Sequence, residues 1–330
     1  MPESRQPLRL VFFGTAEFAV PSLESLVQAG HHVLAVVTQP DRPQGRGMRV
    51  VPSPVKQAAQ RLALPVLQPR RVRAPAFIQQ IRDLSPDALA LAAFGQIIPQ
   101  ELLDIPPLGP INVHGSLLPK YRGAAPVQRA LMAGEAVTGV TTMWMDASLD
   151  TGDILMAEAV PIEPEDTAGT LFPRLASVGA RLLVQTLDGL ATGTLTRQPQ
   201  DHTQATYAPM ITAEDTVVRW TETATQTVNR IRGLSPRPGV FASLRGKRVK
   251  LWGARPADPV GDHPPGTVLA VSKSPPGVLV SCGGNTALLL TEVQPESGRR
   301  MPADDWARGL RLSAGETFEQ MDHSASSAIC

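Results

Sequence analysis

The first 190 residues of the chain alternate between short apolar runs and stretches with helical periodicity. Apolar runs at 9–13, 33–37 and 88–93 have the length of buried strands, and helical patterns separate them. Strands that alternate with helices in this way build a mainly parallel sheet with helices on both faces. The sequence therefore predicts an α/β domain with a Rossmann-like, open, mostly parallel sheet.

The other elements of this domain continue the alternation. Helices are predicted at 21–29, 54–62, 75–84, 125–133 and 171–190, and further strands at 111–114, 140–145 and 153–160. Pro173 belongs to the first turns of the last helix or kinks it. The strand at 153–160 is expected at an edge of the sheet.

The pattern of apolar and polar residues changes after residue 191. Residues 192–210 are polar and lack a sustained apolar period, which predicts a linker. Beyond it lie a helix at 223–232 and five short strand-like runs at 240–244, 249–252, 267–271, 278–281 and 287–293. Gly and Pro turns separate these runs, a pattern typical of a small β-barrel or sandwich. The predicted division is therefore a domain at 1–191, a linker at 192–210 and a smaller barrel domain at 211–330.

Composition bounds the class of protein. A chain of 330 residues has room for two domains, and 42% hydrophobic with 18% charged residues indicates a globular protein. No segment approaches the roughly 18 apolar residues of a membrane span, and the N-terminus lacks signal-peptide features. We expect a cytoplasmic protein that does not bind membranes, and a monomer. Cys282 and Cys330 are far apart and form no metal-ligand cluster, so we expect no metal.

Two polar side chains stand out in the strand at 111–114. Asn112 and His114 share one face of the strand, roughly 6.5 to 7 Å apart, whereas Ile111 and Val113 share the other. A buried strand that carries an amide and an imidazole indicates a polar site beside it. In open α/β sheets ligands bind at the carboxyl ends of the strands, and Gly115 follows at such an end. The pair therefore predicts an edge of an active site.

Asp150 is the third candidate. It follows the strand at 140–145, which we expect to run in the same sense as 111–114, so the three side chains converge if the strands are neighbours. With no activated Ser or Cys, the set suits transfer of an acyl group to an amine of the substrate. The imidazole and the amide would stabilise an oxyanion, and the carboxylate would orient the imidazole. Asp150, His114 and water all remain possible proton acceptors.

A dinucleotide-dependent reaction is disfavoured. The first strand is followed by Phe13-Gly14-Thr15, which lacks the glycine spacing that cradles a pyrophosphate.

These motifs resemble those of a known family. The runs Asn112-Val113-His114-Gly115-Ser116-Leu117-Leu118-Pro119, Tyr121-Arg122-Gly123-Ala124-Ala125-Pro126 and Leu149-Asp150-Thr151-Gly152-Asp153 closely resemble the 10-formyltetrahydrofolate-dependent formyltransferases. The resemblance also covers 13–15, 38–47, 52–56, 95–99 and 165–167, and is weaker in the second domain. It is closest to the members that formylate methionine on initiator tRNA. It implies 10-formyltetrahydrofolate as donor, initiator methionyl-tRNA as acceptor, and Asn112, His114 and Asp150 as the catalytic set.

The resemblance also implies a folate site. The turn Ser116, Leu117, Leu118 and Pro119 is similar to the folate-contacting segment of the family. The run from Phe94 to Ile98, which contains Gly95, Gln96 and Ile97, would line the pterin pocket largely through its backbone. Phe94 stands where tyrosine is more familiar, which removes a hydroxyl but keeps a ring. Asp153 would shape its loop rather than transfer a proton.

Two basic segments are implied to meet the tRNA. The long loop at 38–56 carries Arg42, Arg46 and Arg49, and Arg42 matches the central arginine of the loop that meets the acceptor end in relatives. From the residues alone this is an exposed surface loop. The second domain, an OB-like barrel in the family, carries Arg245, Lys247, Arg248 and Lys250. From the residues alone this basic strand either contacts phosphates or protects a sheet edge. Arg237 stands where relatives commonly carry tryptophan, so the role of that segment in the relatives is not carried over to this chain.

Two other functions fit the same residues. The acceptor could be another amine, on a sugar nucleotide or on glycinamide ribonucleotide. A glycinamide enzyme would typically lack the second domain, and a sugar enzyme would not need the arginine loop. A non-catalytic RNA-binding protein with this fold is the third possibility, and assays with all three amines separate them.

Overall fold

The computed structural model describes residues 6–44, 49–258 and 261–321. The chain forms two compact units. The first comprises Met1–Pro126, Val137–Pro161 and Phe172–Ala208, and the second comprises Val127–Ala136, Ile162–Leu171 and Pro209–Cys330. Two short stretches that precede the polar segment at 192–210 therefore belong to the second unit. The domain boundaries that we predicted, at 191 and 210, remain a prediction.

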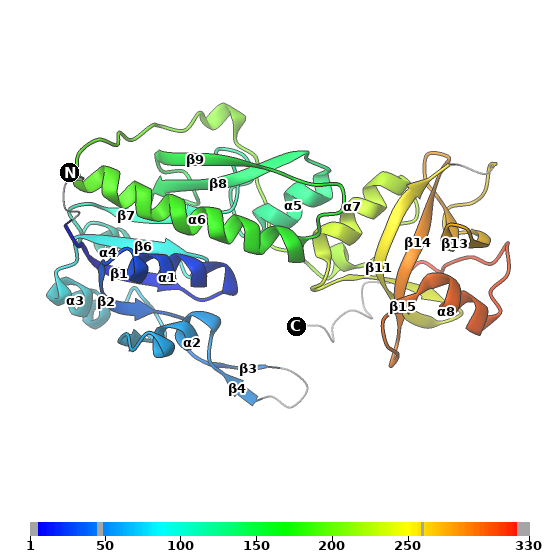
Figure 1. Cartoon of the computed structure of the whole chain (residues 1–330), viewed down its shortest axis with the longest axis horizontal. Helices are drawn as coiled ribbons and strands as arrows, with labels where there is room; N and C mark the ends of the chain where they lie inside the picture. Colours follow the sequence, from blue (N-terminus) through cyan, green and yellow to red (C-terminus); the bar gives the residue numbers. More distant parts are fainter. Residues whose placement is uncertain (1–5, 45–48, 259–260, 322–330) are drawn as a thin grey trace. The chain divides into compact units, whose positions relative to one another are not determined.

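The first unit is built on a seven-stranded sheet in the order β5-β2-β1-β6-β7-β8-β9 (Figure 1). Its strands are β1 (Arg9–Gly14), β2 (His32–Val37), β5 (Val66–Leu67), β6 (Ala88–Ala92), β7 (Pro110–His114), β8 (Val137–Trp144) and β9 (Ile154–Pro161). From β5 to β7 neighbouring strands are parallel. The predicted α/β class, with an open and mostly parallel sheet, is confirmed, and β9 lies at an edge as expected.

The predicted direction of the strand after His114 is wrong. β8 pairs antiparallel with β7, with Thr141 opposite His114 and Trp144 opposite Ile111. The helix between these strands, α5 (Pro126–Ala133), belongs mostly to the second unit. A parallel neighbour of β7 would need a crossover connection, usually a helix packed on the sheet, and most of α5 instead belongs to the other unit.

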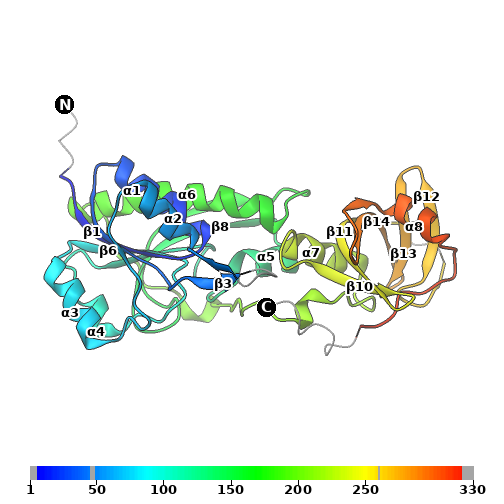
Figure 2. The same ribbon diagram turned by 90° about the horizontal axis from the view of Figure 1, so that it is seen from below.

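Helices cover both faces of this sheet (Figure 2). On one side lie α1 (Val20–Gln28), α2 (Pro54–Arg61) and α6 (Ala168–Ala191), and on the other lie α3 (Pro75–Leu84) and α4 (Gln100–Leu103). Pro173 lies near the start of α6. The side of α3 and α4 buries a cluster that includes Phe13, Leu91 and Phe77. A short hairpin, β3 (Arg42–Gln44) with β4 (Arg49–Val51), projects from the loop that follows β2.

The second unit holds an antiparallel sheet in the order β10-β11-β14-β13-β12, with β15 beside β14. Its elements are α7 (Ala224–Leu234), β10 (Val240–Leu244), β11 (Lys247–Ala257), β12 (Val268–Lys273), β13 (Pro276–Cys282), β14 (Thr286–Pro295), β15 (Met301–Pro302) and α8 (Ala303–Leu310).

The segment 315–319 joins the two edges of this second sheet. Glu319 N donates to Ser243 O of β10, whereas Val268 N of β12 donates to Glu316 O and Phe318 N donates to Gly266 O. Phe318 packs inside against Trp220 and Trp306. These bonds close the sheet into a barrel, and its OB-like character remains a prediction.

Within the described ranges, no helix has both the length and the apolar character needed to cross a bilayer.

Candidate active site

Asn112 and His114 lie on the same face of β7, as the alternation predicts. Asn112 pairs in register with Leu91, whose side chain belongs to the cluster on the α3 and α4 side. Val113 points the other way, and a Cβ on Gly179 of α6 would lie 2.6 Å from its Cγ1. Glycine in α6 therefore lets the helix lie close to the apolar face of β7, while the polar face looks away from it.

His114 is almost fully buried and both ring nitrogens face oxygen atoms. Nε2 lies 2.9 Å from the carbonyl oxygen of Tyr121, which can only accept, so Nε2 carries a proton in this contact. Nδ1 lies 3.7 Å from Oδ2 of Asp150. That distance is longer than a hydrogen bond, as is common for catalytic pairs before substrate binds. The ring is thus held on one side and faces a carboxylate on the other.

Asp150 reaches His114 by a route that the sequence did not predict. Because β8 is antiparallel to β7, it ends at Trp144, at the far end of β7 from His114. The loop after β8 folds back, and Asp150 adopts a left-handed conformation with φ +52°. Its Oδ2 accepts from Gly123 N at 2.8 Å. A Cβ on Gly152 would lie 1.8 Å from Trp144 O, so this tight return requires glycine there.

Asp153, from the same loop, forms an ion pair with Arg197. Its carboxylate accepts from Arg197 Nε at 2.9 Å, and the Arg197 guanidinium stacks over the Trp144 ring at 4.2 Å. These contacts fit the loop-shaping role that the resemblance implies.

The turn after His114 is anchored to β8. The Ser116 hydroxyl is fully buried and donates to Lys120 O at 2.6 Å. The Thr141 hydroxyl donates to Ser116 O at 2.7 Å and accepts from Leu118 N at 3.1 Å. The Leu118–Pro119 peptide is cis. Ser116 therefore uses its hydroxyl to shape the turn, and a direct contact with folate remains a prediction.

The loop after β6 combines left-handed backbone with one exposed apolar side chain. Ala93 and Gly95 both have positive φ, and the Phe94 carbonyl accepts from the Thr15 hydroxyl at 2.8 Å. The Phe94 ring is buried edge-to-face against Phe13, with centroids 5.3 Å apart. Ile97 is 86% exposed, which is unusual for an isoleucine and leaves an apolar side chain beside the twisted backbone. Phe94 fixes the loop from within, so the hydroxyl of a tyrosine is not needed for this packing.

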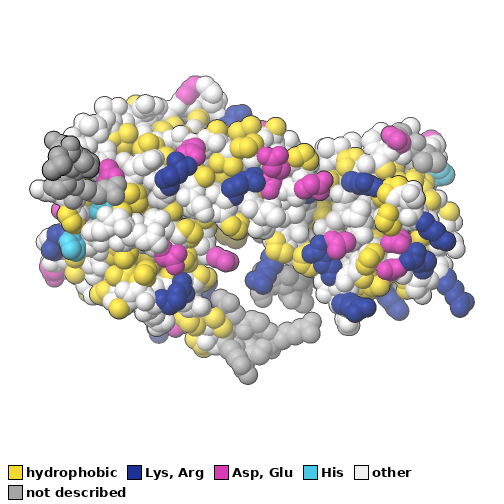
Figure 3. Space-filling model, viewed as in Figure 1, with side chains coloured by type: hydrophobic (Ala, Val, Ile, Leu, Met, Phe, Trp, Pro, Cys, Tyr) yellow, Lys and Arg dark blue, Asp and Glu magenta, His cyan; other side chains and the backbone are white. Residues whose placement is uncertain are grey.

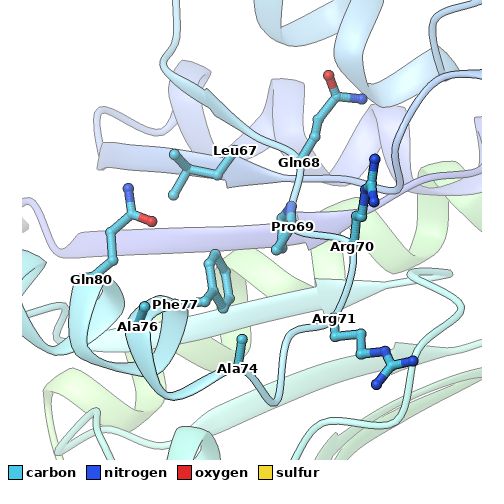
Figure 4. Close-up of a pocket in the computed structure, with 9 residues that line it drawn as sticks. All are labelled: Leu67, Gln68, Pro69, Arg70, Arg71, Ala74, Ala76, Phe77 and Gln80. Atoms are coloured by element: carbon cyan, nitrogen blue, oxygen red, sulfur yellow. The ribbon is translucent and has the colours of Figure 1, made fainter.

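The first unit also contains a cavity of about 720 Å³ (Figure 4). It is formed by the end of β5 and the start of α3, and its lining comprises Leu67, Gln68, Pro69, Arg70, Arg71, Ala74, Ala76, Phe77 and Gln80. The Gln96 side chain accepts from Val72 N at 3.2 Å, which ties the backbone next to the lining residue Arg71 to the loop after β6. Two arginines on an apolar floor suit a ligand with an apolar body and a carboxylate end. All the lining residues lie within 67–80, yet this cavity was not predicted, because strand and helix periodicity does not show that the turn between two elements encloses a hollow.

The base of the β3–β4 hairpin is fixed by charge. Lys56 Nζ donates to Asp41 at 2.6 Å and to Gln68 at 2.8 Å. Hydrogen bonds from Lys56 and Gln68 hold the pKa of Asp41 below its ordinary value. Arg42 follows directly and is exposed. Arg46 lies outside the described residues, and of Arg49 only the backbone, in β4, is described.

Basic and aromatic side chains interleave on the barrel. The Arg248 guanidinium stacks on Phe241 at 3.6 Å, and Lys250 and Arg300 lie over Trp252 at 4.1 and 4.7 Å. We call Arg237, Phe241, Arg248, Lys250, Trp252 and Arg300 the cation–aromatic face. Burial lowers the pKa of Lys250, and the positive charges of Arg237, Arg248 and Arg300 lower it further. In Figure 3 dark-blue Lys and Arg side chains gather on the barrel unit, with magenta acidic groups between them.

Arg245 differs from the other basic residues predicted on the barrel. Its guanidinium makes two hydrogen bonds of 2.7 Å to the Glu316 carboxylate and one to Leu310 O. It therefore secures the segment that closes the barrel. Lys247 is exposed.

Cysteine and metal chemistry find no support in the described residues. Burial raises the pKa of the Cys282 thiol to about 12, which keeps it protonated. Within the described ranges, no three His, Cys, Asp or Glu side chains are grouped to hold a metal ion. The expected absence of a metal remains a prediction.

Sequence comparison matches this chain to known proteins over both units. The formyl transferase profile matches residues 8–187, and the profile of the formyl transferase C-terminal domain matches residues 210–311. The chain belongs to the formyl transferase family. It is 48% identical over 308 residues to methionyl-tRNA formyltransferase of Geobacter sulfurreducens, covering 93% of this chain and 96% of that protein. It is 50% identical over 309 residues to the protein of that name from Solibacter usitatus, covering 94% and 98%.

Solved structures share the fold at lower identity. HypX from Aquifex aeolicus in complex with tetrahydrofolic acid superposes with a TM-score of 0.61 at 18% identity, covering 96% of this chain and 50% of HypX. WlaRD, a sugar 3N-formyl transferase, has a TM-score of 0.61 at 16% identity, covering 89% of this chain and 100% of that one. At these identities the likeness concerns the fold alone.

Proposed function

We propose that this formyltransferase moves the formyl group of 10-formyltetrahydrofolate to the α-amine of methionine on initiator tRNA. The observation that carries the proposal is the identity of 48% and 50%, over more than nine-tenths of the chain, to enzymes named methionyl-tRNA formyltransferase. The match includes the second unit as well as the catalytic one. We expect the enzyme to act as a cytoplasmic monomer.

In the proposed reaction the methionyl amine attacks the formyl carbon of the donor. His114 and the Asn112 amide stabilise the oxyanion of the tetrahedral intermediate, which then collapses as the C–N bond to folate breaks. The amine loses one proton, and the N10 nitrogen of tetrahydrofolate gains one. Support comes from the shared face of Asn112 and His114 and from the 3.7 Å approach of Asp150 to the imidazole. Asp150 orients His114 and assists proton removal.

We propose that the donor lies between the loop at 94–97 and the turn at 116–119. The backbone groups of the first loop suit the pterin, whose edge requires hydrogen-bond partners. The cavity in the first unit suits the glutamyl end of folate, because Arg70 and Arg71 place positive charge where carboxylates would lie.

We propose that the tRNA meets two separate surfaces, one on each unit. On the first unit it is the β3–β4 hairpin, where Arg42 is exposed, and the sequence of this segment also carries Arg46 and Arg49. On the second unit it is the cation–aromatic face, which includes Arg248 and Lys250, with Lys247 nearby in the sequence. Neutralising phosphates makes such binding strongly salt-dependent.

A single-turnover assay with wild-type protein, 10-formyltetrahydrofolate and methionyl initiator tRNA tests the proposal. We expect rapid formylation, and a loss of about 100-fold or more in His114→Ala, because an oxyanion donor is worth that much. A sugar-nucleotide amine and glycinamide ribonucleotide serve as alternative acceptors. Faster turnover of either would overturn the proposed acceptor, and tRNA binding without turnover of any amine would overturn the proposed activity.

A further inference from the structure

We propose that Gln200 is a positioning residue that sets the Asp150 loop against His114. The inference rests on the proposed function for its chemical consequence. Gln200 belongs to the polar segment after α6, where the sequence predicts only a linker, yet its side chain is 5% exposed. No sequence motif singled it out.

Both the nitrogen and the oxygen of the Gln200 side-chain amide make hydrogen bonds. Nε2 donates to the backbone oxygens of Asp150 at 2.9 Å and Gly152 at 2.7 Å. Oε1 accepts from Nε and Nη2 of Arg122 at 3.2 and 2.7 Å. The amide thus links the Asp150 loop to Arg122, a residue that is only 2% exposed.

Arg122 lies between the two residues that hold the catalytic side chains. Tyr121 O receives the His114 ring, and Gly123 N donates to the Asp150 carboxylate. The segment 206–208 fixes the backbone on both sides of Arg122. Arg122 N donates to Thr206 O at 2.9 Å, and Ala208 N donates to Arg122 O at 2.7 Å. Through Arg122 and Gln200 the loops that carry the partners of His114 and Asp150 form one hydrogen-bonded unit.

The left-handed backbone of Asp150 explains why such a brace is needed. With φ at +52°, the Asp150 backbone is less stable by about 1 kcal/mol than it would be in a right-handed helical or extended conformation. This conformation therefore requires support from the surrounding residues. Gln200 donates to the carbonyl of that same residue and to the carbonyl two residues on. If these bonds are lost, the loop can relax and carry the carboxylate away from the imidazole.

Only an amide performs both halves of this contact. Its oxygen accepts from the cation while its nitrogen donates to two carbonyls, and the Arg122 charge polarises the group so that the donated bonds strengthen. A glutamate keeps the bond to Arg122 but has no donor and sets its oxygens against carbonyl oxygens. Gln200→Glu therefore removes the positioning bonds while retaining the anchor, and Gln200→Met removes both.

The kinetic test compares Gln200→Glu with Gln198→Glu, a matched change at an exposed glutamine two residues away. We expect kcat for methionyl-tRNA formylation to fall about 10- to 100-fold in Gln200→Glu, because a displacement of about 1 Å at a catalytic group has that effect. KM values for both substrates should stay within about threefold, and the pH dependence of kcat should shift because Asp150 is displaced. Gln198→Glu should match wild type in all three.

An exchange measurement separates this inference from the proposed function. In native-state hydrogen exchange the Gly123 amide and residues 146–153 should lose protection in Gln200→Glu and Gln200→Met, and not in Gln198→Glu. Unchanged protection with an unchanged kcat per folded molecule would overturn the role of Gln200. Loss of protection in a protein that formylates no methionyl-tRNA, even as wild type, would overturn the acceptor and leave the positioning contact supported.

Discussion

Asp150 and His114 face each other across 3.7 Å because a loop folds back over the polar side of β7, beyond the end of an antiparallel strand. The Asp150 carboxylate makes one backbone hydrogen bond, from Gly123, and otherwise looks toward the imidazole. An amide could accept the same bond from Gly123, so the proposed role of Asp150 depends on its charge.

Asp150→Asn isolates that charge. The amide oxygen can still accept from Gly123, so the thermal midpoint should change by no more than about 2 °C, whereas kcat should fall about 100- to 10,000-fold because acid–base assistance is lost. The measurement is the pH–rate profile under single-turnover conditions. If the pH–rate profile keeps its wild-type shape and only the rates fall, Asp150 acts by orienting His114. If the acidic or the basic limb of the profile disappears, Asp150 is the group that takes the proton. A rate within threefold of wild type would contradict both roles.

At the scale of single residues, the sequence predicted where the candidate site side chains lie better than it predicted the residues that hold them in place. Alternation placed Asn112 and His114 on one face, because strand periodicity is a local property. It could not predict that Asp150 would arrive from an antiparallel strand, or that Gln200 would hold it, because both depend on which distant segments become neighbours. Residue types gave no help either, since a glutamine in a polar stretch is ordinarily exposed.

At the scale of elements, predictions succeeded where the apolar period was sustained. The helix α3 and the strand β10 have the predicted bounds. The short α8 was missed, since eight residues with two aspartates at the start resemble a turn until Trp306 and Ala307 are seen to pack into the barrel. The β3–β4 hairpin was also missed, because Pro and Gly in a basic loop predict irregular structure.

The cation–aromatic face of β10 and β11 yields a prediction at this scale. Burial and three nearby arginines lower the pKa of Lys250, so an anion placed there would relieve repulsion among four cations. We expect Lys250→Gln to weaken tRNA binding about 3- to 10-fold and to reduce the slope of log K against log salt by about 1, because one phosphate contact is lost. Lys273→Gln, at an exposed position on β12, is the control. Equal slopes for the two variants would contradict a role for this face.

At the scale of the whole molecule, the chain contributes to its second unit in three stretches. Segments 127–136 and 162–171 come from the part of the sequence that we assigned to the first domain. Arg232 of α7 donates to the backbone oxygens of Glu163 and Asp166 at 2.8 and 2.7 Å. Domain boundaries placed where the sequence pattern changes could not anticipate this, because helical periodicity does not reveal which hydrophobic core a helix joins.

The Arg129–Asp215 pair holds one of these stretches to the barrel unit. Arg129 Nη1 and Nη2 donate to the two carboxylate oxygens at 2.8 and 2.7 Å, and Thr212 N donates to Oδ2 at 2.9 Å. Burial alone would raise the pKa of Asp215, but the bonds from Arg129 and the Thr212 amide outweigh it and hold the pKa below the ordinary value of 3.8. The ionised form is therefore the one that stabilises the fold.

We expect Asp215→Asn to destabilise the second unit by about 2 kcal/mol at neutral pH, because a largely buried guanidinium loses its charged partner. Since the folded pKa is depressed, the wild-type advantage should be complete above about pH 5 and should shrink as the pH falls through 3.8 toward the folded value. Urea unfolding followed by tryptophan fluorescence suits the test, because Trp220, Trp252 and Trp306 lie in this unit and only Trp144 lies in the other. Glu214→Gln, an exposed neighbour, controls for loss of an acidic residue. A wild-type advantage that persists unchanged at pH 3 would mean that packing, and not the charge of Asp215, fastens residues 127–136 to the barrel unit.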